Sequence, residues 1–153
     1  MKRHKQVNMG SVSCATMRTE DLIPAFLSAL GSQRPLQRAH RNLISDIEAS
    51  IEANSAGDCS ATYDLEQLSD ALDAYSPAYF YFGAHSGDGA DYGWWLSEEW
   101  EQQLVDDGGI EVSDLADVPV DHVGNVAVVN DHGNITLYRR GRNHRLYEVW
   151  SVV

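Results

Sequence analysis

Lysine and arginine are absent from residues 42–138, although this stretch carries 20 of the chain's 23 Asp and Glu residues. All 11 basic residues lie toward the two ends, and the formal net charge is −12. Such a charge places a negative field over the middle of the protein, which repels nucleic acid and attracts basic surfaces. The absence of lysine and arginine from this stretch argues against direct nucleic-acid binding and favours a basic protein as partner.

Cysteine and long apolar runs are also scarce. Cys14 and Cys59 supply no framework of disulfides or metal ligands, so a reducing, cytoplasmic setting is the simpler expectation. No apolar run approaches the roughly 18 residues of a membrane span, so we expect no membrane association. The basic start of the chain lacks the apolar stretch of a signal peptide.

The composition is that of a folded protein, with 43% hydrophobic and 22% charged residues. A length of 153 residues is enough for one ordinary domain with a core. Residues 1–18 show no hydrophobic periodicity and predict a disordered leader. We therefore expect a single domain over residues 19–153.

Apolar residues recur at helical spacing in the first half of the chain. They predict a helix over residues 20–30, with Thr19 as its N-cap, and a second helix over residues 35–53. After a loop at residues 54–60, Asp64 is the expected N-cap of a third helix that continues to Tyr75.

The second half of the chain has the pattern of strands. Aromatic strands are expected at residues 79–82 and 92–96, around a glycine-rich loop, followed by a short helix from Ser97 to Leu104 and a helix or turn at residues 113–116. A hairpin is expected from residues 125–130 and 135–140, and a last strand at residues 146–152 places Leu146, Glu148, Trp150 and Val152 on one face. The fold class is therefore α+β, with three N-terminal helices followed by an antiparallel sheet and a C-terminal hairpin.

The glycine-rich loop offers one candidate active site. His85, Asp88 and Asp91 lie within seven residues and could serve as metal ligands or acid–base groups of a small hydrolase. The alternative is a tight turn in which glycine allows positive φ and aspartate caps backbone amides, and we favour it because no known metal-site spacing matches. No nucleophile motif or phosphate-binding loop is present, so we assign no catalytic residue, metal or cofactor.

Two further polar clusters have simpler interpretations. Asp131 and His132 resemble a catalytic dyad, but their setting between two Val/Ile-rich runs is typical of a hairpin loop. The basic cluster near the C-terminus favours internal pairing with Asp and Glu or a solvated hairpin tip over phosphate binding; it consists of Arg139, Arg140, Arg142 and Arg145.

The candidate partner-binding residues are the carboxylates that fall on the solvent side of the expected helices, together with one tryptophan. Trp94 and Trp95 are neighbours in an expected strand, so one should face the core and the other the opposite side, where it would mark a contact surface. The set is Asp46, Glu48, Glu52, Glu66, Asp70, Asp73, Trp95, Glu98, Glu99, Glu101, Asp106 and Asp107.

Three segments carry a resemblance to known proteins: residues 81–94 (YFGAHSGDGADYGW), 128–138 (VVNDHGNITLY) and 148–153 (EVWSVV). Over residues 79–153 the chain resembles small phage- and prophage-encoded proteins of unknown function. This resemblance implies a setting in the cytoplasm of a bacterial host and supplies no catalytic residue. A weaker likeness, confined to residues 79–95, is to the Smi1/Knr4-type immunity and adaptor proteins.

These observations leave several functions open. The favoured one is a non-enzymatic acidic protein of phage or prophage type that binds a basic host partner, as a nucleic-acid mimic or an inhibitor of host machinery. The alternatives are a metal-dependent hydrolase at His85, Asp88 and Asp91, and a phage structural or assembly component. Solubility alone is a further explanation of the acidity, and the sequence leaves the oligomeric state open.

Overall fold

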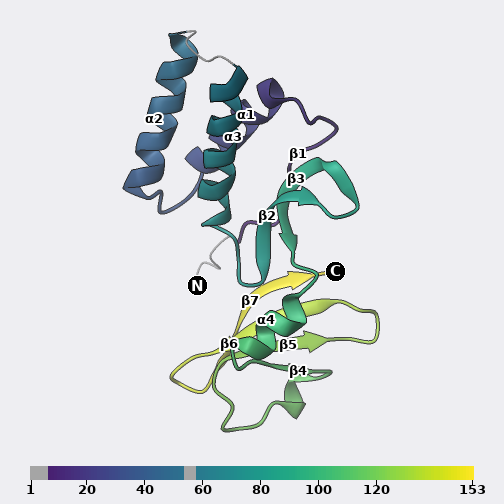
Figure 1. The fold of residues 1–153 in the computed structure, drawn as a ribbon. Helices are drawn as coiled ribbons and strands as arrows, with labels where there is room; N and C mark the ends of the chain where they lie inside the picture. The colour runs from purple at the N-terminus through teal and green to yellow at the C-terminus, as the bar shows by residue number, and fades with distance from the viewer. Residues whose placement is uncertain (1–6, 54–57) are drawn as a thin grey trace. The chain divides into compact units, whose positions relative to one another are not determined.

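The computed structural model describes residues 7–53 and 58–153, and the chain divides into two compact units. The N-terminal unit comprises Asn8–Trp95, and the C-terminal unit comprises Leu96–Val153 together with Val7. Each unit contains its own sheet, and the sequence prediction of one domain over residues 19–153 did not anticipate this division. The helices and strands are labelled in Figure 1.

The N-terminal unit combines helices α1–α3 with a three-stranded sheet in the order β1-β3-β2. The predicted α+β class is confirmed, but a strand precedes the first helix. The bounds are β1 (Gly10–Ser13), α1 (Thr19–Gly31), α2 (Arg38–Glu52), α3 (Asp58–Asp73), β2 (Phe80–His85) and β3 (Asp88–Leu96).

Strand β1 corrects the prediction that residues 1–18 form a disordered leader. It pairs antiparallel with β3, with Ser11 opposite Gly93, and Val12 packs against the core of the unit. The approach of the two backbones is so close that a Cβ at Gly93 would collide with the backbone of Gly10. Sequence periodicity missed this strand because four residues are too few to show a period. Residues 1–6 lie outside the described part of the chain.

The core of the N-terminal unit is aromatic where the helices meet the sheet. Phe26 of α1 packs edge-on against Phe82 of β2 at 5.0 Å between ring centroids, and Phe82 packs against Trp94 at 4.9 Å. The indole N–H of Trp94 donates to the carbonyl of Leu72 at 3.2 Å, which ties β3 to α3. Helix α1 packs against both α2 and α3, and α3 packs against β2.

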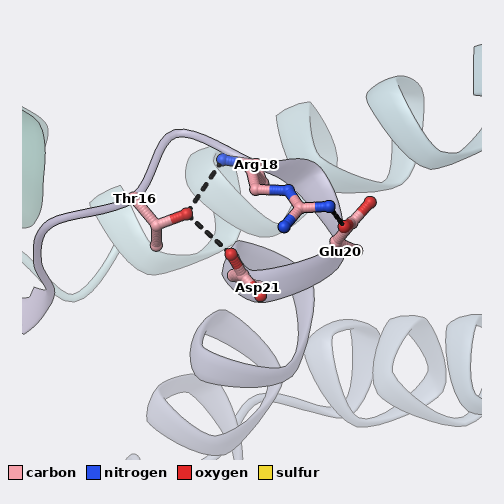
Figure 2. A network of polar contacts seen from close by, with 4 residues as sticks. All are labelled: Thr16, Arg18, Glu20 and Asp21. Carbon is pink, nitrogen blue, oxygen red and sulfur yellow. Dashed lines mark hydrogen bonds and ion pairs between the residues drawn. The ribbon is translucent and has the colours of Figure 1, made fainter.

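Helix α1 begins with a small polar network (Figure 2). The hydroxyl of Thr16 accepts from the backbone N–H of Arg18 at 3.2 Å and donates to the Asp21 carboxylate at 2.7 Å. Arg18 occupies the N-cap position without a side-chain cap and forms an ion pair with Glu20. The predicted N-cap, Thr19, is instead the first helical residue, and the polar contacts that fix the helix start come from a threonine three residues earlier.

Helix α3 begins earlier than the sequence suggested. Asp64, the predicted N-cap, lies inside the helix, which starts at Asp58. The helix extends toward its N-terminus because Ala61 packs against the core on the same stripe as Leu65, Leu68 and Leu72. Residues 54–57, the greater part of the predicted loop, lie outside the described residues.

The C-terminal unit contains a four-stranded sheet in the order β4-β5-β6-β7. Strand β4 runs parallel to β5, and the other pairs are antiparallel, so the sheet is mixed rather than purely antiparallel. Helix α4 contacts β4 and follows the first sheet in sequence, so the helices are not all N-terminal. The bounds are α4 (Trp100–Asp106), β4 (Ile110–Val112), η1 (Leu115–Asp117), β5 (Asn125–Val129), β6 (Ile135–Arg140) and β7 (Leu146–Val152).

The predicted hairpin of β5 and β6 and the predicted last strand are confirmed. A bulge in β7 corrects the predicted face of that strand. Leu137 pairs with Trp150 whereas Tyr138 pairs with Glu148, so one extra residue lies between the two pairs. Because a bulge shifts the alternation of side chains, Trp150 is buried and Glu148 is exposed.

Candidate functional site

Helix α2 carries three of the candidate carboxylates on its solvent side. Asp46, Glu48 and Glu52 are exposed, whereas Ile47 is buried and Ile44 packs partly against the core. Glu48 and Glu52 are four residues apart and therefore neighbours on the helix surface. Glu52 is also the last residue of the helix, where the helix dipole places partial negative charge.

Helix α3 carries three more, on the side opposite its buried leucines. Glu66, Asp70 and Asp73 are exposed, and Glu66 and Asp70 form a second like-charge pair at a spacing of four. Asp73 differs from the other two because its carboxylate accepts from the backbone N–H of Phe82 at 2.8 Å and from the Ser76 hydroxyl at 3.0 Å. Asp73 therefore joins α3 to β2 and has a structural use.

The other five candidate carboxylates of α2 and α3 form no ion pair with a described residue. In the part of the chain that the structure describes, the only ion pair joins Arg18 to Glu20 (Figure 2). We call these five residues the acidic helical face. Their carboxylates also make no side-chain hydrogen bond within that part of the chain. Figure 1 shows α2 and α3 side by side, so both rows of charge belong to one helix pair. The acidic helical face comprises Asp46, Glu48, Glu52, Glu66 and Asp70.

The remaining candidate carboxylates belong to the C-terminal unit, on and around α4. All five are exposed, and the carboxylate of Asp106 accepts from the side chain of Gln102 at 2.8 Å. The structure therefore separates the predicted acids into two groups, one in each unit. The C-terminal group comprises Glu98, Glu99, Glu101, Asp106 and Asp107.

Trp95 lies apart from the acidic helical face. Trp94 faces the helices, and neighbouring residues of a strand point to opposite faces, so Trp95 lies on the face of β3 turned away from them. Its indole N–H donates to the carbonyl of Gly83 at 3.1 Å, and its ring meets that of His85 at 4.7 Å and 85°. Trp95 is half-buried and held by its own hairpin, so the structure does not join it to the helical carboxylates.

The predicted glycine-rich loop is mostly strand, with β2 and β3 separated by Ser86 and Gly87 alone. Each candidate active-site residue there has a structural hydrogen-bond partner. His85 Nδ1 accepts from the N–H of Gly87 at 3.0 Å, and the Asp88 carboxylate accepts from the N–H of Ala90 at 3.0 Å. Asp91 accepts from the Ser11 hydroxyl at 2.5 Å and so joins β3 to β1. Among the side chains that the structure describes, those of residues 7–53 and 60–153, no group of three His, Cys, Asp or Glu is placed to hold a metal ion.

The loop between β5 and β6 is organised by Asn130. Its side-chain oxygen accepts from the N–H of His132 at 2.9 Å and from the N–H of Asn134 at 3.0 Å, and Gly133 has a positive φ of 78°. These contacts are those of a turn, as the sequence indicated for Asp131 and His132.

The arginines near the C-terminus were the cluster that sequence reasoning undervalued. Internal pairing with Asp and Glu was one of their two expected roles, yet no carboxylate among the described residues pairs with any of them. We call the turn and strand end that carry them the arginine hairpin: Arg139, Arg140, Arg142 and Arg145. Four arginines within seven residues, after a long stretch that has none, were the available signal.

No family model, no curated protein and no solved structure matches this chain. No helix in the part of the chain that the structure describes combines the length and the apolar character needed to cross a membrane.

Proposed function

We propose that this chain is a non-enzymatic binding protein whose acidic helical face contacts a basic surface of a partner protein. The observation that carries the proposal is the two pairs of like-charge neighbours, Glu48 with Glu52 and Glu66 with Asp70, which are exposed and form no ion pair with a described residue. Each pair of like charges at this spacing destabilises a helix by about 0.2–0.5 kcal/mol. A lysine at one position of each pair would stabilise the same helix.

The position of these charges along the helices also favours a partner. Glu52 and Asp70 lie in the last turns of their helices, where acids are disfavoured, and Arg38 and Arg41 lie in the first turn of α2, where acids would be favoured. Solubility needs only a net charge far from zero and is indifferent to these positions. A cationic surface, by contrast, gains from carboxylates about 6 Å apart along a helix axis, since each can meet a separate lysine or arginine.

The resemblance to phage and prophage proteins supplies the proposed setting, a bacterial cytoplasm. There, a row of exposed carboxylates would occupy a nucleic-acid-binding surface of a host protein in place of phosphates and so inhibit it. The hydrolase alternative gains no support, because His85, Asp88 and Asp91 are each engaged in the β2–β3 hairpin and in its contact with β1.

The proposal is tested by titrating the protein with a fluorescein-labelled arginine homopeptide at about 50 and 200 mM salt. One variant neutralises four carboxylates of the acidic helical face: Glu48→Gln, Glu52→Gln, Glu66→Gln and Asp70→Asn. The control neutralises four of the C-terminal group and changes the net charge equally: Glu98→Gln, Glu99→Gln, Glu101→Gln and Asp106→Asn.

The face variant should bind the peptide about tenfold more weakly, because four exposed ion pairs together contribute about 1–2 kcal/mol. The control should lose no more than about twofold. Equal losses in the two variants would mean that net charge alone attracts the peptide, and the proposal would be wrong. If the face variant alone loses binding, capture from a host lysate at the same two salt concentrations would identify the natural basic partner.

A further inference from the structure

The arginine hairpin is an ordered cationic turn. The N–H of Gly141 donates to the carbonyl of Arg145 at 2.8 Å, closing the turn between β6 and β7. Asn143 accepts from the N–H of Arg145 at 3.2 Å and donates to the Tyr147 hydroxyl at 2.5 Å. Arg139, Arg142 and Arg145 are exposed, so their charges are presented from a turn whose backbone is fixed.

Two of the four guanidinium groups are further positioned by neutral acceptors. The Nε–H of Arg139 donates to the side-chain oxygen of Asn125 at 3.1 Å, and Arg140 donates to the carbonyls of Pro119 and Val120 at 3.2 and 2.5 Å. The Nε of Arg140 is buried and has no hydrogen-bond partner among the described residues. None of these contacts offsets positive charge, and Arg142 and Arg145 have no ion pair within the described chain.

A cationic turn that forms no ion pair with a described residue is unexpected in a chain with 23 Asp and Glu residues and a net charge of −12. We propose that the arginine hairpin of one copy binds the acidic helical face of a second copy of this chain. Arginine suits this role because its planar fork matches the two oxygens of a carboxylate. The hairpin is the part of the described chain with the highest density of cations, and the helical face is the complementary surface that every copy brings.

This contact rests on the acidic helical face of the proposed function and joins two different surfaces. Each copy carries one hairpin and one helical face, so two copies either pair reciprocally or leave a free hairpin and a free face, through which association continues to longer chains or closes into a ring. A bound basic partner would cover the helical face and end the association. The two activities therefore compete for one surface.

The association is weak, because two molecules of net charge −12 repel each other at long range. It is measured by sedimentation equilibrium from about 10 μM to about 1 mM protein. The wild-type mass should rise with concentration at moderate salt and return to that of a monomer at about 1 M salt, where charges are screened beyond about 3 Å.

Two variants separate the surfaces. The hairpin variant carries Arg142→Gln and Arg145→Gln, and the face variant is the one used above with the arginine peptide. Each alone should remain monomeric. An equimolar mixture should reach twice the monomer mass and stop there, since the intact helical face of one variant meets the intact hairpin of the other. Arg38→Gln with Arg41→Gln removes the same charge from α2 and should leave the wild-type association unchanged.

A hairpin variant that associates as the wild type does, or a wild type that stays monomeric at about 1 mM, would overturn the inference. Failure of the proposed function is detected by a separate measurement, the binding of the arginine peptide. The hairpin variant should bind that peptide at least as well as the wild type does. Normal peptide binding without self-association removes this inference alone, and absent peptide binding removes the proposed function.

Discussion

The helices of the N-terminal unit and the turns of the C-terminal unit use polar side chains in different ways. On α2 and α3 the backbone amides bond within the helix, so exposed carboxylates such as Glu48 and Glu66 have no structural task. In the C-terminal unit, Asp114 accepts from the N–H of Ala116 at 2.8 Å, and Asn130 and Asn143 organise the turns of β5–β6 and β6–β7. The comparison teaches that charge on a helix is available for binding where polar groups in turns are already occupied.

The cores of the two units differ as well. The N-terminal core lies between helices and a sheet and is centred on Phe26, which is completely buried. The C-terminal core lies on a mixed sheet with one short helix and buries Leu104, Leu137 and Trp150. Each core should therefore be sensitive to its own substitutions.

The largest expected effects come from truncating one large buried side chain in each core, one core at a time. Phe26→Ala should lower the free energy of unfolding of the N-terminal unit by about 3–5 kcal/mol, and Leu137→Ala should lower that of the C-terminal unit by about 2–5 kcal/mol. Hydrogen exchange read by mass spectrometry should show faster exchange confined to the unit that carries the change. Val105→Ala, at a side chain that is 64% exposed, is the control and should cost less than about 0.5 kcal/mol. Loss of protection in both units from either core variant would contradict the division into two units.

The next effect tests whether β1 belongs to the N-terminal unit. Gly93→Ala places a methyl group against the backbone of Gly10, so β1 must shift or detach, at a cost of about 1–3 kcal/mol. The amides of residues 10–13 should lose protection first. Gly89→Ala is the matched control in the same strand, since no atom lies within 4 Å of its added Cβ. Equal effects of the two changes would show that β1 is not held at Gly93.

Local periodicity in the sequence was enough to predict several elements. The stripes of α1 and α2, the β5–β6 hairpin and strand β7 were all found within a few residues of their observed bounds. Elements that depend on distant partners were missed: β1 needs β3, and the bulge that turns Glu148 outward depends on pairing with β6. The start of α3 depends on Ala61 packing against the core.

For the candidate site too, features set by local periodicity were predicted and features set by distant contacts were missed. Helical periodicity placed the acids of α2 and α3 in solvent correctly, because exposure on a helix follows from spacing. Periodicity could not show that Asp73 bonds to the backbone of Phe82, since that contact joins two elements. The absence of ion pairs at the arginine hairpin among the described residues was hidden for the same reason, because pairing of charges is decided by the tertiary fold.

Asp73 and Asp70 separate a structural carboxylate from a solvated one on the same helix. Asp73→Ala leaves the N–H of Phe82 without its acceptor and should cost about 1–3 kcal/mol. Asp70→Ala should stay within about 0.5 kcal/mol of the wild type, since its carboxylate has no bond in the described chain. Urea denaturation measures both. A cost at Asp70 equal to that at Asp73 would mean that the acidic helical face also maintains the fold.

The smallest expected effect has the opposite sign and bears on why these helices are acidic. Asp70→Lys replaces a like-charge pair by an opposite-charge pair, with Glu66 on the favourable N-terminal side, and puts a cation in the last turn of α3. Stability should therefore rise by about 0.4–1 kcal/mol. Urea denaturation at low salt measures the gain, and Asp70→Asn should give about half of it. The same lysine variant should bind the arginine peptide more weakly. A gain in stability together with weaker peptide binding would show that Asp70 contributes to binding at the expense of stability. Unchanged peptide binding would assign Asp70 to solubility alone.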